Sequence, residues 1–176
     1  MKLLTGLLLT FLVAATVSSD NSKTLMIGNS GEPATLDPHK YNLRLEETLL
    51  NDLFLGLTTF NADGEIVAGA AESWETSADG LTWRFFLRED LKWSDGKNLT
   101  AEDFVYSFRR LLNPQTAASL SYFLYMIKNA EQVNNAQKAV SSLGVYSDGP
   151  HILVIELDRP YPYLLERLLY PTGFPV

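Results

Sequence analysis

Cysteine is absent from this 176-residue chain, and histidine occurs only twice, as His39 and His151. The lack of cysteine excludes a disulfide framework, thiol catalysis, thiolate metal ligands and a lipid-modified cysteine. Basic residues are also scarce, with 14 Lys and Arg against 21 Asp and Glu, which gives a formal charge of −7. An acidic surface repels phosphate backbones and offers no polybasic membrane patch. The composition therefore argues against a nucleic-acid partner.

The first 19 residues resemble a secretory signal peptide. Met1-Lys2 is a positively charged start, residues 3–17 form a mainly apolar run, and Ser18-Ser19 supplies small residues for cleavage. The alternative is an uncleaved membrane anchor, but the run is shorter than the ~20 residues that a spanning helix needs. We predict cleavage near Ser19 and export. Because cleavage removes Lys2, the mature chain would carry 13 basic and 21 acidic residues, a charge of −8.

The rest of the chain has the apolar content of a folded protein, 46% of residues, and its patterns predict an α+β fold. A leucine stripe of helical spacing at Leu45, Leu49 and Leu53 predicts a helix. Alternation over 81–88 predicts a strand with one buried face. Thr100 followed by two acids predicts a helix start. Strands are also predicted at 24–28, 57–60, 66–67, 72–76, 144–147 and 151–157. The helix that starts after Thr100 should end at Asn113-Pro114, and two further helices are predicted over 129–140 and 163–169.

Several residue groups that could suggest chemistry have simpler explanations. Asp37-Pro38-His39 contains a His–Asp pair, but no nucleophile motif accompanies it, so we favour a turn. The adjacent Glu102 and Asp103 would diverge by ~100° on a helix, so we expect them to complement the helix start. Asp-Gly pairs at 63, 79, 95 and 148 lack calcium-loop spacing and predict turns. We therefore predict no catalytic residue, no metal ligand and no cofactor.

A set of short motifs then occurs in a fixed order over nearly the whole mature chain. The densest are Trp83–Arg88 and Lys92–Gly96; the others are Glu32-Pro33, Leu36–His39, Leu53–Leu57, Ala70–Trp74, Asn98–Arg110, Leu143–Val145 and Pro160–Tyr163. Each motif is weak alone. The ordered set resembles the bacterial extracellular solute-binding proteins of family 5, which are receptors of ABC importers, and is most similar to their peptide- and oligopeptide-binding branch.

The resemblance implies a fold of the type II periplasmic-binding-protein kind. Residues 20–55 would be the amino-terminal segment of lobe 1, and 56–176 would be the inserted α+β domain of the peptide-binding family. The second lobe would be absent, since family members are much longer. This implies either a truncated product or a fragment.

The resemblance also implies binding residues. A short extended segment within residues 39–45 would line the cleft and pair with the main chain of a peptide, at about Asn42, Leu43 and Arg44. The alternative is a plain lead-in to the first helix. A family tyrosine contact falls near Leu120 here, and Tyr122 is the better candidate.

The expected function is that of a substrate-binding component of an ABC peptide importer. It would capture extended oligopeptides in the periplasm as a monomer and deliver them to ABC permease subunits of the inner membrane. The chain alone would bind peptide weakly or not at all. The alternatives are a protein-interaction module without a ligand site, a non-functional truncated remnant or, least favoured, a hydrolase. Within the resemblance, the ligand could also be a dipeptide, a nickel chelate, haem or a sugar.

Overall fold

The computed structural model describes residues 26–176, so the predicted signal peptide and residues 24–25 of the first predicted strand lie outside the described residues. The elements in chain order are α1 (Arg44–Leu53), β1 (Thr58–Phe60), β2 (Ile66–Ala68), β3 (Ala71–Thr76), β4 (Thr82–Leu87), α2 (Ala101–Leu112), α3 (Ala130–Asn134), β5 (Val145–Ser147), β6 (Ile152–Glu156) and α4 (Leu164–Arg167), with short 3-10 turns at η1 (Pro114–Thr116), η2 (Ser121–Leu124), η3 (Val140–Ser142) and η4 (Pro171–Gly173). Within residues 26–176, no helix has both the length and the apolarity to cross a bilayer.

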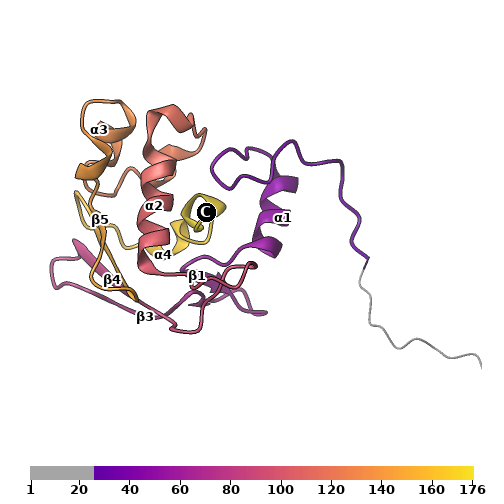
Figure 1. Cartoon of the computed structure of the whole chain (residues 1–176), viewed down its shortest axis with the longest axis horizontal. Coiled ribbons are helices and arrows are strands. Elements are labelled where there is room, and N and C mark those ends of the chain that lie inside the picture. The colour runs from indigo at the N-terminus through magenta and orange to yellow at the C-terminus, as the bar shows by residue number, and fades with distance from the viewer. Residues whose placement is uncertain (1–25) are drawn as a thin grey trace, which may run out of the picture.

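The main sheet has four antiparallel strands in the order β3-β4-β6-β5, and β1 and β2 form a separate hairpin. The predicted alternation is confirmed in β4, where Trp83, Phe85 and Leu87 are buried and their neighbours less so. Phe85 lies opposite Trp74 on one side and Leu153 on the other. This buried face packs against α2, which stands between the sheet and α1 (Figure 1).

The helix predicted after Thr100 is also confirmed. The Thr100 N–H donates to Asp103 Oδ2 at 2.7 Å, so the carboxylate caps the first turn of α2. Phe104, Phe108 and Leu111 lie on the buried side of the helix and are almost fully inaccessible. The aromatic core is therefore built between α2 and the sheet.

All four Asp-Gly pairs form turns or bends, with glycine φ values of 79°, 71°, 87° and 87° at Gly64, Gly80, Gly96 and Gly149. Asp79 and Asp95 each accept the backbone N–H of the residue two positions ahead at 3.0 Å. The predicted strands from 57 to 88 and from 144 to 157 are confirmed to within one residue at each end.

Other predicted elements are wrong in extent. The helix expected over 129–140 is confined to α3, because Asn129 and Ala136 on either side adopt positive φ of 64° and 57°. The last helix covers Leu164–Arg167 instead of 163–169. Residues 26–28 of the first predicted strand are not in a strand. In α1 the leucine stripe is not the buried face: Glu46 and Leu50 are buried, while Leu53 is 62% exposed.

Candidate functional site

A buried carboxylate organises the loop that leads into α1. Glu46 Oε1 accepts the N–H groups of Ala34 (3.0 Å) and Thr35 (3.3 Å), and Oε2 accepts those of Asn42 (3.0 Å) and Leu43 (3.1 Å). These bonds, the one from Asn42 most, lower the pKa of Glu46 despite its burial. The loop is therefore folded around one ionised side chain.

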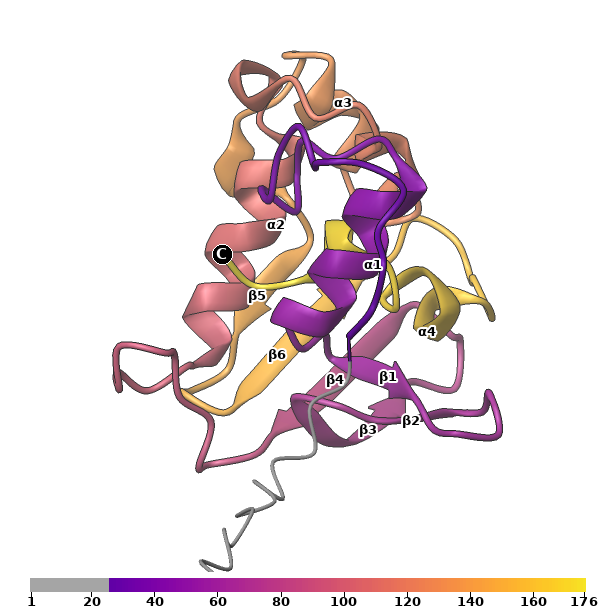
Figure 2. The same ribbon diagram turned by 90° about the vertical axis from the view of Figure 1, so that its right-hand side faces the viewer.

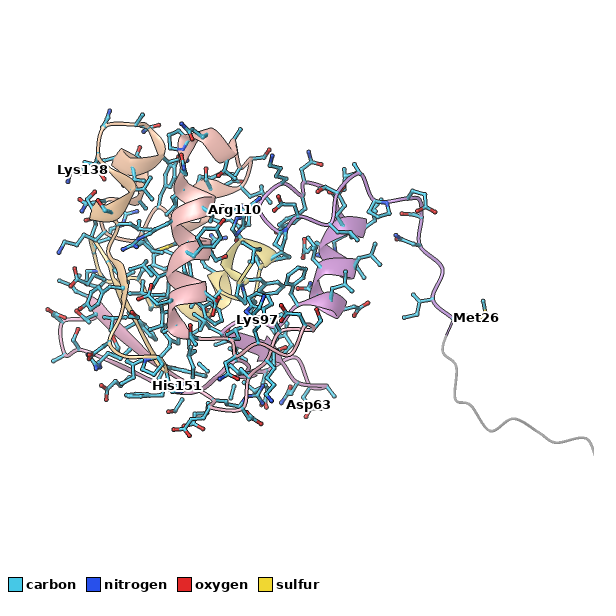
Figure 3. The ribbon with its side chains drawn as sticks, in the orientation of Figure 1. Met26, Asp63, Lys97, Arg110, Lys138 and His151 are labelled. Carbon is cyan, nitrogen blue, oxygen red and sulfur yellow. The ribbon has the colours of Figure 1, made fainter. Side chains whose placement is uncertain are left out.

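A second polar cluster joins this loop to α2. Arg110 donates to both oxygens of Asp37, from Nη2 to Oδ2 at 2.6 Å and from Nη1 to Oδ1 at 2.9 Å. The His39 N–H also donates to Asp37 Oδ1, at 3.0 Å, which confirms the predicted turn. These bonds, the one from Arg110 most, lower the pKa of Asp37 to about 2. Figure 3 shows Arg110 between α2 and the amino-terminal loop.

The imidazole of His39 is buried in this cluster. Arg110 Nη1 lies 2.8 Å from Nδ1, and Ser107 Oγ lies 3.2 Å from Nε2 and donates to the Phe174 carbonyl at 2.5 Å. Nδ1 therefore accepts from Arg110, and Nε2 donates its proton to Ser107. Burial, and then the neighbouring guanidinium, lower the pKa of His39 to about 4. Both ring nitrogens are engaged, so His39 links three segments of the chain.

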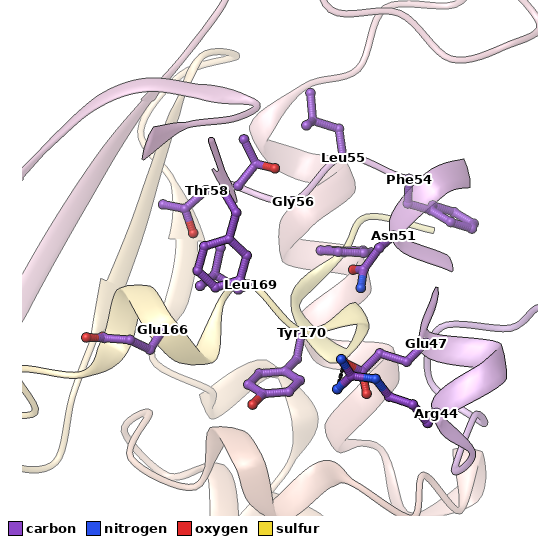
Figure 4. A pocket seen from close by; sticks show the side chains of 13 residues that line it. Arg44, Glu47, Asn51, Phe54, Leu55, Gly56, Thr58, Glu166, Leu169 and Tyr170 are labelled. Carbon is purple, nitrogen blue, oxygen red and sulfur yellow. Dashed lines mark hydrogen bonds and ion pairs between the residues drawn. The ribbon is translucent and has the colours of Figure 1, made fainter. Parts of the chain in front are cut away.

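A hollow of about 580 Å³ opens beside these clusters, between α1, β1 and the segment after α4 (Figure 4). Arg44, Glu47 and Asn51 line it from α1, residues 58–60 line it from β1, and Glu166, Leu169 and Tyr170 line it from the opposite side. Aromatic surface with a few charged groups is typical of a ligand site. Among residues 26–176, acidic and histidine side chains do not gather in threes as a metal site would require.

The floor of the hollow depends on one close approach. Phe54 stacks on Phe174 with ring centroids 6.4 Å apart, and a Cβ at Gly56 would lie 2.6 Å from the Phe174 ring. Glycine at position 56 therefore allows the strand after α1 to meet the carboxyl-terminal segment.

The predicted residues Asn42 and Leu43 form the lead-in to α1, and Arg44 is its first residue. The N–H groups of Asn42 and Leu43 are donated to Glu46 and are not free for a ligand. Arg44 lines the hollow; its side chain is 88% exposed and lies 3.5 Å from Glu47. The first N–H groups of a helix have no acceptor within the helix, so the main chain at Arg44 can donate outward.

Tyr122 lies on a neighbouring part of the surface. It is 56% exposed in the 3-10 turn Ser121–Leu124 and lines a smaller hollow of about 160 Å³. Its ring packs edge-on against Phe123, with ring centroids 4.8 Å apart, and Phe123 packs edge-on against Tyr170, with centroids 5.3 Å apart. The structure thus brings Arg44 and Tyr170 into one hollow and places Tyr122 beside it, through Phe123.

The sequence interpretation missed Tyr41 and Tyr170. Tyr41 is buried, its hydroxyl has no hydrogen-bond partner among residues 26–176, and its pKa is raised by burial, then by Glu47, Tyr170 and Tyr122. No periodicity marks either residue, because each is set by contacts between segments far apart in the chain.

Comparison with known proteins identifies the fold. The family described as bacterial extracellular solute-binding proteins, family 5 Middle, matches residues 65–176. The periplasmic oligopeptide-binding protein OppA of Escherichia coli is 38% identical over 166 residues, which cover 93% of this chain and 30% of that protein. The E. coli periplasmic murein peptide-binding protein MppA is 40% identical over 147 residues, or 82% of this chain and 27% of the relative.

Solved structures of relatives have the same arrangement. The E. coli murein tripeptide-binding protein MppA matches with a TM-score of 0.80 at 40% identity, over 85% of this chain and 29% of that one. Haemophilus influenzae OppA in complex with RPPGFSPFR matches with a TM-score of 0.80 at 37% identity, over 82% and 29%. This chain thus spans about 30% of the length of these relatives. It belongs to the bacterial extracellular solute-binding proteins of family 5.

Proposed function

We propose that this chain supplies one wall of the ligand cleft of a periplasmic oligopeptide receptor that serves an ABC importer. The observation that carries the proposal is the 580 Å³ hollow at the start of α1, in a chain whose fold matches an OppA bound to a peptide. The proposal includes export by a signal peptide at 1–19 and the division into a lobe-1 segment, 20–55, and an inserted domain, 56–176.

The chemistry of the hollow suits an extended peptide. The Arg44 N–H at the start of α1 can pair with a peptide carbonyl, which gives affinity without reading side chains. Phe60, Leu169 and Tyr170 offer apolar surface to a peptide side chain, while Arg44 and Glu166 can meet its charged groups. Holding and releasing a peptide in this way requires no bond cleavage, so the chain acts as a receptor and not as an enzyme.

Capture would involve a second wall. In a two-lobed receptor, a hinge closes both lobes over the ligand, and the closed form is presented to the permease. One wall alone leaves most of a peptide in solvent, so residues 20–176 by themselves should bind it only weakly.

The test compares residues 20–176 with a chimera in which residues 26–176 replace the equivalent part of H. influenzae OppA. Calorimetric titration with RPPGFSPFR should give no binding below millimolar concentration for the isolated chain. The chimera should bind within about tenfold of the parent, and Tyr170→Ala should weaken its binding at least tenfold, about 1.4 kcal/mol. Tyr146→Ala, on β5, is the matched control and should have no effect. A folded chimera that does not bind the peptide, or an isolated chain that binds it with micromolar affinity, would contradict the proposal.

A further inference from the structure

The smaller hollow beside Tyr122 carries positive charge in a chain that is acidic overall. Its volume is about 160 Å³, and its lining includes Arg159, Tyr161, Arg167, Tyr122 and Phe123. Two of the residues that line it are basic and none is acidic, whereas the whole sequence has 21 acidic residues against 14 basic ones. An anion is therefore attracted to this hollow.

The acidic residues next to these arginines in the sequence face elsewhere. Asp158 lines a different hollow, and its Oδ2 accepts the Asn129 N–H at 3.3 Å. Glu166 lines the hollow of about 580 Å³. Within residues 26–176, neither Arg159 nor Arg167 forms an ion pair. Both guanidinium groups can therefore bind an external anion without giving up an internal one.

The guanidinium of Arg167 is held in a fixed orientation. Its Nε donates to the Tyr161 hydroxyl at 3.2 Å, and its central carbon lies 5.1 Å from the centre of the Phe123 ring. Because the Tyr161 oxygen accepts this bond, the hydroxyl proton can be donated to another group. A planar guanidinium with both Nη nitrogens available suits a carboxylate, which it binds through two parallel N–H···O bonds.

The position and size of the hollow indicate where that carboxylate comes from. Phe123 lines it and packs edge-on against Tyr170, which lines the neighbouring hollow of about 580 Å³. Ligand pockets usually measure ~300–1,000 Å³, so a hollow of about 160 Å³ holds one chemical group and not a whole ligand. Resting on the proposed function, we infer that this hollow is a subsite for a carboxylate of the bound peptide, supplied by an acidic side chain or by the carboxyl terminus.

The test uses the H. influenzae OppA chimera and variants of RPPGFSPFR in which each internal residue is replaced in turn by Glu or by Gln. At one position the Glu peptide should bind about tenfold more tightly than the Gln peptide, because hydrogen bonds between charged groups contribute more than those to an amide. Arg159→Gln and Arg167→Gln should each reduce this ratio about threefold. Arg88→Gln, exposed and one residue beyond β4, is the matched control and should leave the ratio unchanged.

The carboxyl-terminal amide of RPPGFSPFR tests the other source of the carboxylate. If amidation weakens binding about tenfold and the same two arginine substitutions remove that difference, the subsite holds the carboxyl terminus. A chimera that binds the peptides but shows neither difference would overturn the inference and leave the proposed function intact. A folded chimera that binds none of the peptides would contradict both.

A second measurement does not depend on peptide binding or on a folded chimera. In residues 20–176, N-acetylglutamate at millimolar concentration should shift the amide NMR signals of Arg159, Tyr161 and Arg167, and N-acetylglutamine should not. Arg88→Gln should preserve these shifts, and Arg159→Gln should reduce them. Equal effects of the two compounds, or no effect of either, would overturn the carboxylate subsite.

Discussion

The body formed by α2 and the four-stranded sheet is stabilised differently from the amino-terminal segment, residues 32–54. In the body, Phe85, Phe104 and Phe108 are almost completely buried in one continuous core. In the segment, Leu50 is the one fully buried leucine, and the attachments are polar: Glu46 folds the loop and Asp37 holds Arg110. Figure 2 shows α1 standing in front of α2 as a separate layer.

This difference has a functional meaning. A core held by apolar burial is stable and insensitive to pH, whereas a segment held by charged groups responds to protonation and leaves its own apolar residues for other contacts. The hollow of about 580 Å³ lies along that segment, at the boundary with the body.

Phe104→Ala should have the largest effect because it opens a cavity in the core between α2 and the sheet. We expect a loss of about 3–5 kcal/mol in the free energy of unfolding, measured by urea denaturation. Leu53→Ala on the exposed side of α1 is the control and should change stability by less than about 0.5 kcal/mol. Equal losses at the two positions would remove the contrast between body and segment.

The stability of the segment should depend on pH through His39. The folded pKa is about 4 against an ordinary value of 6.5, so the neutral form is favoured by folding. The stabilisation that neutral His39 gives to the folded state is fully present above pH 6.5. As the pH falls toward 4, this stabilisation decreases by on the order of 2–3 kcal/mol. Asp37, with a pKa lowered to about 2, adds a further loss below its ordinary pKa of 3.8.

Unfolding of the wild type and His39→Gln at several pH values between 7 and 4.5 measures this dependence. The substitution should flatten the slope, although it also lowers stability at pH 7 by disturbing the contacts with Arg110 and Ser107. An unchanged slope in His39→Gln would assign the pH dependence to other groups.

Glu46→Gln should loosen the loop with a smaller cost. The amide keeps one oxygen but turns an NH2 group toward two backbone N–H donors. We therefore expect the free energy of unfolding to fall by about 1–2 kcal/mol. Hydrogen exchange should accelerate at Ala34, Thr35, Asn42 and Leu43 and remain unchanged in β4. Glu47→Gln, one residue further along α1, is the matched control and should leave those amides unchanged. Acceleration throughout the sheet would show that Glu46 stabilises more than the loop.

The smallest effect is a difference within the unmodified chain. Amides of residues 34–54 should exchange faster than those of 81–88, because local opening there breaks few apolar contacts. Equal protection would place both regions in one cooperative unit and would also contradict the predicted boundary at 55–56.

Sequence patterns predicted the elements whose determinants are local. Alternation defined β4, Thr100 and Asp103 defined the start of α2, and the Asp-Gly pairs defined the turns, because each signal lies within a few residues. The buried face of α1 was not predictable in this way. Glu46 lies on that face where the leucine stripe was expected, and its carboxylate accepts backbone N–H groups from the loop that precedes the helix.

The candidate site was predicted only in part for the same reason. The resemblance named Arg44, which lines the hollow, but Tyr170, which lines the same hollow, comes from over 100 positions later in the chain. The Asp37–Arg110 pair likewise joins residues 73 positions apart. Neither contact leaves a periodic or compositional trace in the sequence.

The location of the peptide site can be tested most directly by hydrogen exchange on the H. influenzae OppA chimera, with and without RPPGFSPFR. We predict that the peptide slows exchange at Arg44, Glu47, Leu169 and Tyr170, which line the hollow, and leaves β5 and α3 unchanged. Protection confined to other parts of the chimera, with no change at the start of α1, would contradict the assignment of this hollow as a wall of the peptide cleft.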